Sequence, residues 1–158
     1  MNFDSAFGQL MLHEGGYSND AHDNGGATRY GITEGVAREV GYRGDMRELP
    51  LDLAKRIYRD RYWDAMCCDD LPASIRHAVF DAAVNSGVAQ SARWLQRAVG
   101  VEADGVIGPK TLAAAKETPP DALRCHILSN RLRMMTSLPS WEFFGRGWTK
   151  RICDLLDA

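Results

Sequence analysis

Residues His13–Thr33 read HEGGYSNDAHDNGGATRYGIT, and this stretch decides the fold and the chemistry expected of the chain. The preceding residues 3–13 carry apolar side chains at the i, i+4, i+7 and i+8 spacing of an amphipathic helix. Gly15 and Gly16 end that helix, because glycine takes the left-handed cap conformation at little cost. Glu14 therefore falls at the helix end, where the helix dipole disfavours an ionised carboxylate. A carboxyl that stays protonated near neutral pH can serve as a general acid.

A second acidic residue, Asp23, is followed by a glycine pair at 25–26 and then by Thr28. The glycines allow a tight hairpin that folds back over the helix end and brings Asp23 and Thr28 opposite Glu14 across a cleft. One protonated and one ionised carboxyl suit cleavage of a glycosidic bond, and the hydroxyl could help to hold a water. Turn chemistry at Asp23 and a solvated helix end at Glu14 explain the same spacing, so spacing alone leaves both interpretations open.

The order of the motifs in this stretch is similar to the signature of glycoside hydrolase family 108, a group of phage and bacterial N-acetylmuramidases. The matching pieces are Glu14-Gly15-Gly16-Tyr17, Asp23-Asn24-Gly25-Gly26-Ala27-Thr28 and Tyr30-Gly31-Ile32-Thr33. The order of Glu, Asp and Thr also resembles the catalytic trio of the helical phage lysozymes. The resemblance implies Glu14, Asp23 and Thr28 as catalytic residues, and we expect Tyr30 to contact substrate.

The resemblance implies hydrolysis of the β-1,4 bond between N-acetylmuramic acid and N-acetylglucosamine, in the manner of a phage or prophage endolysin. Glu14 would protonate the leaving oxygen, Asp23 would activate water or stabilise positive charge on the sugar, and Thr28 would assist. Inversion requires carboxyls about 6.5–9.5 Å apart and retention about 5–5.5 Å; the lysozyme analogy favours inversion. The alternatives are a non-catalytic peptidoglycan-binding module, a chitinase-like hydrolase and a lytic transglycosylase, the last disfavoured by Asp23 beside Thr28. No cofactor or metal is expected.

Composition is that of a soluble globular protein, with 158 residues, 45% of them hydrophobic and 25% charged. The net charge of −2 does not indicate a nucleic-acid binder, and the absence of a long apolar run predicts no membrane insertion. The expected partner is the glycan strand of peptidoglycan, bound by a monomer. The C-terminal third is basic and either attracts an anionic wall polymer or forms a solvated helix face, through Arg124, Arg131, Arg133, Arg146, Lys150 and Arg151.

The first residues lack the basic and apolar regions of a signal peptide, so we expect synthesis in the cytoplasm. Action on the cell wall, in the periplasm, would then need release through a holin or a dedicated export route. The four cysteines, Cys67, Cys68, Cys125 and Cys153, match no zinc pattern and are expected as mostly packed thiols. A disulfide formed after export, between one of the adjacent pair and Cys125 or Cys153, remains an alternative.

Apolar periodicity predicts a mainly α, lysozyme-like fold of seven or so helices with one small β-hairpin beside the active-site cleft. Thr33 is the expected N-cap of the second helix, and Pro72 and Pro109 are expected to open later ones. In the last helix, Phe144 and Trp148 are expected inside, and substrate contact is an alternative for Trp141 and Trp148. The predicted helices cover residues 3–13, 34–40, 51–63, 73–87, 88–100, 110–117, 121–136 and 140–156.

Residues Trp94–Leu112 resemble the peptidoglycan-binding region of the same family, with Trp-Leu-Gln and Asp-Gly-x-Ile-Gly-Pro-x-Thr-Leu pieces. This piece is too short to bury its own core, so we expect one compact domain over residues 1–158. Within it, residues 1–68 would form the catalytic lobe and residues 69–158 a helical lobe, with a tight turn at Asp104-Gly105.

Two further residues are expected at the edge of the cleft, between the 14–33 segment and the helices that follow. Asn85 shares a helix face with Asp81, which we interpret as its structural partner. Tyr62 belongs to an aromatic group with Tyr58 and Trp63, which either packs in the core or faces sugar. Asn85 and Tyr62 are therefore predicted substrate-binding residues beside Tyr30.

Overall fold

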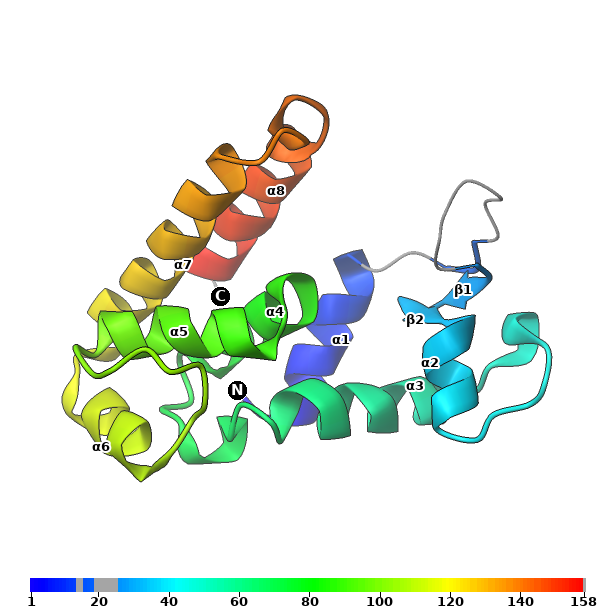
Figure 1. Cartoon of the computed structure of the whole chain (residues 1–158), viewed down its shortest axis with the longest axis horizontal. Coiled ribbons are helices and arrows are strands. Elements are labelled where there is room, and N and C mark those ends of the chain that lie inside the picture. Colours follow the sequence, from blue (N-terminus) through cyan, green and yellow to red (C-terminus); the bar gives the residue numbers. More distant parts are fainter. Residues whose placement is uncertain (14–15, 19–25, 158) are drawn as a thin grey trace. The chain divides into compact units, whose positions relative to one another are not determined.

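The computed structural model describes residues 1–13, 16–18 and 26–157, and in these ranges it is mainly α-helical with one small antiparallel sheet (Figure 1). The predicted fold class is confirmed. The helices are α1 (Phe3–His13), α2 (Glu34–Glu39), α3 (Leu51–Tyr58), α4 (Arg76–Ser86), α5 (Val88–Ala98), α6 (Pro109–Glu117), α7 (Pro120–Thr136) and α8 (Trp141–Leu156), and the strands are β1 (Thr28–Arg29) and β2 (Ile32–Thr33).

Most helix boundaries lie within a residue or two of those predicted. Thr33 caps α2, since its Oγ1 accepts a hydrogen bond from the Val36 amide at 3.4 Å. Two predictions need correction. A π-helical turn, Arg59–Trp63, replaces the last turn of the helix expected over 51–63. Helix α4 begins at Arg76, because the residues after Pro72 form a separate turn in which the Ile75 amide donates to the Pro72 carbonyl.

The chain forms two compact units, here called the N-terminal unit (Phe3–Arg61) and the C-terminal unit (Met1–Asn2 with Tyr62–Ala158). The division falls between Arg61 and Tyr62, whereas the sequence placed the lobe boundary between residues 68 and 69. The single compact domain stays a prediction, and each unit is described by itself.

The N-terminal unit is built around the apolar face of α1. Phe3, Phe7 and Leu10 are buried, as the spacing predicted, and the Phe7 ring meets the ring of Tyr58 edge-on at 5.6 Å. Burying each large apolar side chain contributes about 1.5–3 kcal/mol. Helix α3 supplies the other wall with Ile57 and Tyr58, both almost fully buried. Tyr58 is thus a packing residue, one of the two alternatives left open for it.

The hairpin of this unit lies further along the chain than predicted. Strands β1 and β2 pair with Thr28 opposite Thr33, and their turn is Tyr30-Gly31. Both turn residues have positive φ, 52° and 73°, as a two-residue hairpin turn of the primed type requires. The glycine pair at 25–26 is therefore not this turn, and only Gly26 of the pair lies among the described residues.

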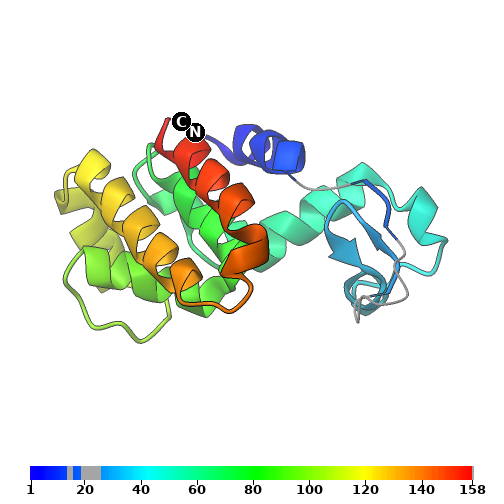
Figure 2. The ribbon, with the colours of Figure 1, turned by 90° about the horizontal axis from the view of Figure 1, so that it is seen from above.

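The C-terminal unit is a helical assembly in which α7 and α8 run side by side as an antiparallel hairpin (Figures 1 and 2). Its buried cluster joins α4 to this hairpin. Trp141 and Trp148 pack against the cluster, so packing is the role found for both tryptophans. Phe144 corrects the prediction for the last helix: it is 58% exposed, and its ring lies 5.9 Å from that of Trp148. The cluster consists of Ala78, Leu128, Met135, Ile152 and Leu155.

A buried ion triad ties α4, α7 and α8 together. Asp81 has no exposed surface, and its Oδ1 accepts from Arg131 Nη1 at 2.5 Å while Oδ2 accepts from Arg151 Nε at 2.8 Å. Burial opposes ionisation of Asp81, but the two guanidiniums outweigh it and hold the pKa of Asp81 below its usual value. Asp81 is structural, as expected. Arg131 and Arg151 are not part of a solvated basic face, whereas Arg146 and Lys150 are exposed.

The predicted tight turn at Asp104-Gly105 is present. The Asp104 carboxylate accepts from the Val106 amide at 2.8 Å and from Gln96 Nε2 at 2.6 Å. Gln96 is almost fully buried on α5, and its Oε1 accepts from the Gly105 amide at 2.9 Å. The glutamine therefore fixes the loop between α5 and α6 against the helices.

The four cysteines are free thiols, but they are less packed than predicted. Cys68 is buried, whereas Cys125 on α7 and Cys153 on α8 are exposed. Neither of these two positions belongs to the apolar stripe of its helix, so their side chains point to solvent. A bilayer-spanning helix would need a long apolar run, and none of the described helices has one.

Candidate functional site

Two of the three predicted catalytic residues, Glu14 and Asp23, lie outside the described residues. The described part of α1 ends at His13, the residue before Glu14. Thr28 is described, and it is the first residue of β1. The geometry of the candidate site is therefore built from Thr28 and the hairpin that carries it.

Thr28 is fixed through both its backbone and its side chain. Its amide and carbonyl form a pair of 2.8 Å hydrogen bonds with Ser18, which places it between Ser18 on one side and Thr33 on the other. The half-buried Thr28 hydroxyl donates to the Gly26 carbonyl at 3.2 Å. Because its proton is used there, the hydroxyl oxygen offers lone pairs to any further donor. A water is such a donor, so Thr28 is suited to accept a hydrogen bond from one.

The turn beside Thr28 is anchored from the core of the N-terminal unit. The Tyr58 hydroxyl donates to the carbonyl of Tyr30 at 3.0 Å, across 28 positions in the sequence. This bond restrains a turn residue whose left-handed backbone is unfavourable for a side chain larger than glycine. Sequence inspection did not predict this anchoring, because the partner of the hydroxyl is a backbone atom far away in the chain.

Tyr30, a predicted substrate contact, lies on the turn with its ring half-buried. The Arg29 guanidinium stacks on this ring at 4.9 Å and also donates to the Tyr30 hydroxyl at 3.1 Å. Arginine and tyrosine thus present one combined cationic and aromatic edge. Thr28 and Tyr30 are the two predicted site residues that the structure brings together on one element.

A polar hollow of about 420 Å³ adjoins the hairpin at Ala27. Tyr17, from the Glu-Gly-Gly-Tyr motif, lines it, and the Arg47 guanidinium lies 5.5 Å from the Tyr17 ring. Arg38 on the same wall donates to the carbonyls of Tyr42 and Gly44 and to the Glu34 carboxylate. This hollow was not predicted, because its lining combines Tyr17 and Ala27 with residues of α2 and of the segment that follows α2.

The other predicted substrate contacts, Tyr62 and Asn85, belong to the C-terminal unit. Asn85 is exposed at the end of α4, and its Nδ2 donates to the Asp81 carbonyl at 2.9 Å. Tyr62 is half-buried, whereas its neighbour Trp63 is fully buried with its ring 5.5 Å from that of Phe80. Packing is therefore confirmed for Trp63. A role in substrate binding stays a prediction for Tyr62 and Asn85.

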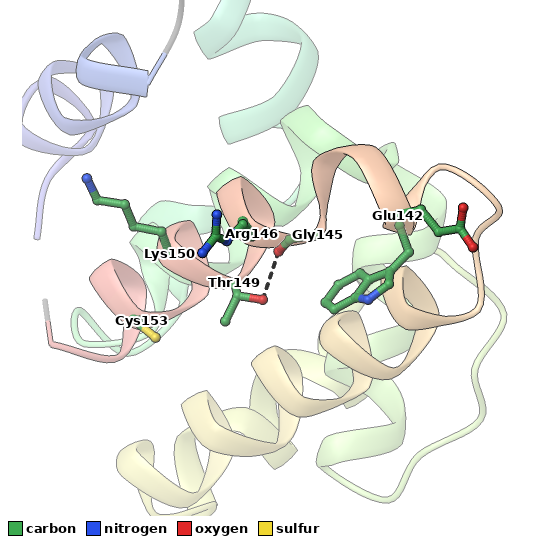
Figure 3. A pocket seen from close by; sticks show the side chains of 7 residues that line it. Glu142, Gly145, Arg146, Thr149, Lys150 and Cys153 are labelled. Carbon is green, nitrogen blue, oxygen red and sulfur yellow. Dashed lines mark hydrogen bonds between the residues drawn. The ribbon is translucent and has the colours of Figure 1, made fainter.

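A second hollow, here called the α8 hollow, lies on the surface of the C-terminal unit and measures about 590 Å³ (Figure 3). Its lining residues all come from one face of α8, and they combine an aromatic ring, a hydroxyl and charged groups. They are Trp141, Glu142, Gly145, Arg146, Thr149, Lys150 and Cys153. The spacing of these residues is visible in the sequence, but the apolar pattern of α8 predicts only the interior face of the helix.

Within the described ranges, His, Cys, Asp and Glu side chains nowhere gather in groups of three that could hold a metal ion. At the hairpin, Thr28, Arg29 and Tyr30 offer a hydroxyl, a guanidinium and an aromatic ring.

Two family models match the chain in succession. Residues 7–87 match the family described as "Glycosyl hydrolase 108", a range that includes all three predicted catalytic residues. Residues 90–153 match the family described as "Predicted Peptidoglycan domain", which includes the whole α8 hollow. Among curated proteins no match was found.

Among solved structures, the chain is similar to SagA of Brucella abortus. The two are 37% identical, with a TM-score of 0.87, and the match covers 98% of this chain and 91% of the SagA chain. A likeness of this extent includes both units and carries the expected lysozyme-like helical fold.

Proposed function

The chain belongs to glycosyl hydrolase family 108, and we propose that this peptidoglycan hydrolase is an N-acetylmuramidase. It would cleave the β-1,4 bond between N-acetylmuramic acid and N-acetylglucosamine. The family match supports a glycoside hydrolase, and the peptidoglycan domain that follows it supports the cell-wall polymer as the partner. The choice of bond rests on the motif from Glu14 to Thr28.

One observation supports hydrolysis by this motif most directly. The motif lies within the matched residues 7–87, and its described member, Thr28, holds its hydroxyl with the proton donated to Gly26 and the lone pairs available. An oxygen in this state can accept a hydrogen bond from the nucleophilic water but cannot donate one without first breaking its bond to Gly26. Thr28 would therefore orient the water, with Asp23 as the base that activates it.

In the proposed mechanism Glu14 protonates the leaving oxygen while the water attacks the anomeric carbon from the opposite face. This arrangement inverts the configuration and requires carboxyls about 6.5–9.5 Å apart. Asp23 would take the proton from the water as the bond to the leaving group breaks. Proton transfer by a positioned side chain contributes about 10²–10⁴-fold to the rate.

The test is mass spectrometry of the fragments that wild type and Glu14→Gln release from purified peptidoglycan. We expect reducing N-acetylmuramic acid ends from wild type and a loss of rate of about 10²–10⁴-fold in the variant. Thr28→Val, which removes the hydroxyl at nearly constant shape, should slow the reaction less. The anomer formed first, followed by NMR, separates inversion from retention.

Each of the other outcomes would indicate a different activity for this protein. Anhydromuramic ends would mean a lytic transglycosylase, and reducing glucosamine ends a glucosaminidase. Rapid cleavage of chitin oligomers would mean a chitinase-like hydrolase. Wall binding without any fragments, from either protein, would mean a binding module.

We also propose that the enzyme acts as an endolysin that folds in the cytoplasm and reaches the wall after holin-type release or export. Four free thiols are typical of proteins that fold in a reducing compartment. Expression in a bacterium with and without a co-expressed holin tests this. Lysis only in the presence of the holin is expected, and lysis without it would contradict the proposal.

A further inference from the structure

The α8 hollow has an aromatic wall that depends on a glycine. A methyl group at Gly145 would stand 2.8 Å from both Cδ2 and Cε2 of Trp141, atoms of the bond shared by the two indole rings. The indole therefore lies against the bare backbone of Gly145, one helical turn further along α8. Any larger residue at 145 would displace it. The ring is half-buried, so part of it remains open to the hollow that it lines.

The open side of the hollow is cationic. Arg146 and Lys150 are exposed, and neither forms an ion pair with any residue that the structure describes. They stand four residues apart on one helix, where like charges repel each other. Glu142 also lines the hollow, but Figure 3 shows its carboxylate directed away from both cations. An anion placed beside Arg146 and Lys150 would relieve this repulsion.

Thr149 adds a neutral acceptor between the ring and the cations. Its hydroxyl donates to the Gly145 carbonyl at 2.8 Å, which leaves the oxygen lone pairs for an incoming donor (Figure 3). Taken together, the hollow offers an apolar ring face, a hydrogen-bond acceptor and two cations. A ligand that matches all three has a sugar or other flat apolar face, hydroxyl or amide donors, and a carboxylate.

We propose that the α8 hollow binds the muramyl peptide of the glycan strand. The N-acetyl sugar packs on the indole of Trp141, a hydroxyl or amide group donates to Thr149, and a carboxylate lies between Arg146 and Lys150. The site rests on the proposed function only in that peptidoglycan is the ligand. It would hold the enzyme on the wall between successive cleavages.

The carboxylate has two possible sources in peptidoglycan. One is the stem peptide, whose residues carry free carboxyl groups. The other is the lactyl group of muramic acid, which is free only where the peptide has been removed. A purified disaccharide–tetrapeptide, its peptide-free disaccharide and chitobiose therefore form a series that separates the two sources from neutral sugar.

The test is calorimetric titration of the full-length protein with these three probes, alongside sedimentation with intact sacculi. The disaccharide–tetrapeptide should bind, and chitobiose should bind at least about tenfold more weakly, with binding weakened by salt. Arg146→Glu with Lys150→Glu changes only exposed side chains and should reduce affinity about tenfold. Trp141→Ala should reduce it about five- to tenfold.

Trp141 also packs against the core, so Gly145→Ala provides a second test of the ring. Alanine favours a helix more than glycine does, yet its methyl displaces the indole. Matched controls are Phe143→Ala, an 81% exposed ring on the same helix outside the hollow, and Lys116→Glu, an exposed cation on α6. Both controls should bind like wild type.

Affinity unchanged in the Arg146/Lys150 double variant and in Gly145→Ala would overturn the proposal, as would equal binding of chitobiose. Binding of the peptide-free disaccharide at full strength would support it with the lactyl group as the source. Fragment analysis of wild type is independent of these titrations. Reducing muramic ends with unaffected binding in the variants would refute only the α8 site, whereas variant-sensitive binding without fragments would refute only the muramidase.

Discussion

Thr28 lies on a strand of two residues, whereas Trp141 begins a helix of sixteen. The strand is held by its pairing with Ser18 and Thr33 and by the Tyr58 hydroxyl on the adjacent turn. Helix α8 is held by a buried apolar cluster and by the Asp81 ion triad. The proposed catalytic element therefore depends on a few local bonds, whereas the proposed binding surface depends on the stability of a whole unit.

The largest effect that tests this comparison is expected at the triad. Asp81→Asn leaves Arg131 buried without its charge partner, and breaking a buried ion pair from one side costs about 3–5 kcal/mol. Thermal unfolding followed by circular dichroism should show a large fall in Tm. Asp121→Asn is the matched control, since the exposed Asp121–Arg124 pair should contribute less than about 1 kcal/mol. A small effect of Asp81→Asn would mean that the apolar cluster alone holds α8.

The triad also predicts a dependence on acid. The pKa of Asp81 is lowered in the folded protein, so its stabilising effect is complete above the carboxyl pKa of the unfolded chain, about 3.9, and is lost as pH falls through the lower folded value. The free energy of unfolding should therefore decline below about pH 4. Urea titrations at several pH values should show a smaller decline in Asp81→Asn. If the free energy of unfolding declined equally with pH in wild type and Asp81→Asn, Asp81 would not be the source of the acid sensitivity.

An intermediate effect is expected at the hairpin turn. Gly31→Ala places a side chain at φ 73°, which costs about 1–2 kcal/mol, and the displaced strand should slow peptidoglycan hydrolysis about tenfold to a hundredfold. Gly35→Ala in α2 is the control, because only the Thr33 hydroxyl lies as near as 4.0 Å to the added methyl. It should keep full activity. If the Gly31→Ala enzyme were as active as wild type, the turn would not be needed to position Thr28 for hydrolysis.

The smallest effect is expected from one hydroxyl. Tyr58→Phe keeps the ring against Phe7 and removes the hydroxyl that donates to the Tyr30 carbonyl, a loss of about 1 kcal/mol for that bond. The rate of hydrolysis should fall while muropeptide affinity at the α8 hollow stays unchanged. The rate of peptidoglycan hydrolysis and the muropeptide affinity should be measured on the same preparation of the variant. A variant that loses stability but no activity would show that the anchor does not position the site.

The periodic helices could be predicted because each carries its own apolar repeat, as α1 does with Phe3, Phe7 and Leu10. The hairpin was misplaced, since a Gly-Gly pair and Tyr30-Gly31 are both good turn formers and only the strand register distinguishes them. The ion triad could not be predicted, because Asp81 lies 50 and 70 positions from its arginines. Within the described residues, Thr28 and Tyr30 lie on one hairpin, but its turn is Tyr30-Gly31 and not the predicted glycine pair.

The α8 hollow differs from the ion triad, because the spacing of its lining residues can be read directly from the sequence. Trp141 and Gly145 are spaced i, i+4 and therefore meet on one helix face, where a glycine in mid-helix would otherwise be unfavourable. The apolar pattern of the helix favours interior packing for Trp141 and does not by itself reveal the role of Gly145. A mid-helix glycine one turn after a tryptophan is thus a signal for a ring lying on the helix surface.

The distribution of thiols in the C-terminal unit allows the natural chain to be labelled with a dye that detects ligand binding. Burial raises the pKa of Cys68, and burial with the nearby carboxylates of Asp70 and Asp64 raises that of Cys67, so both react slowly as nucleophiles. Exposed Cys125 and Cys153 are then the positions at which a maleimide dye attaches first. Because Cys153 lines the α8 hollow, its fluorophore would sense a ligand entering beside it, while Cys125 on α7 supplies the reference signal.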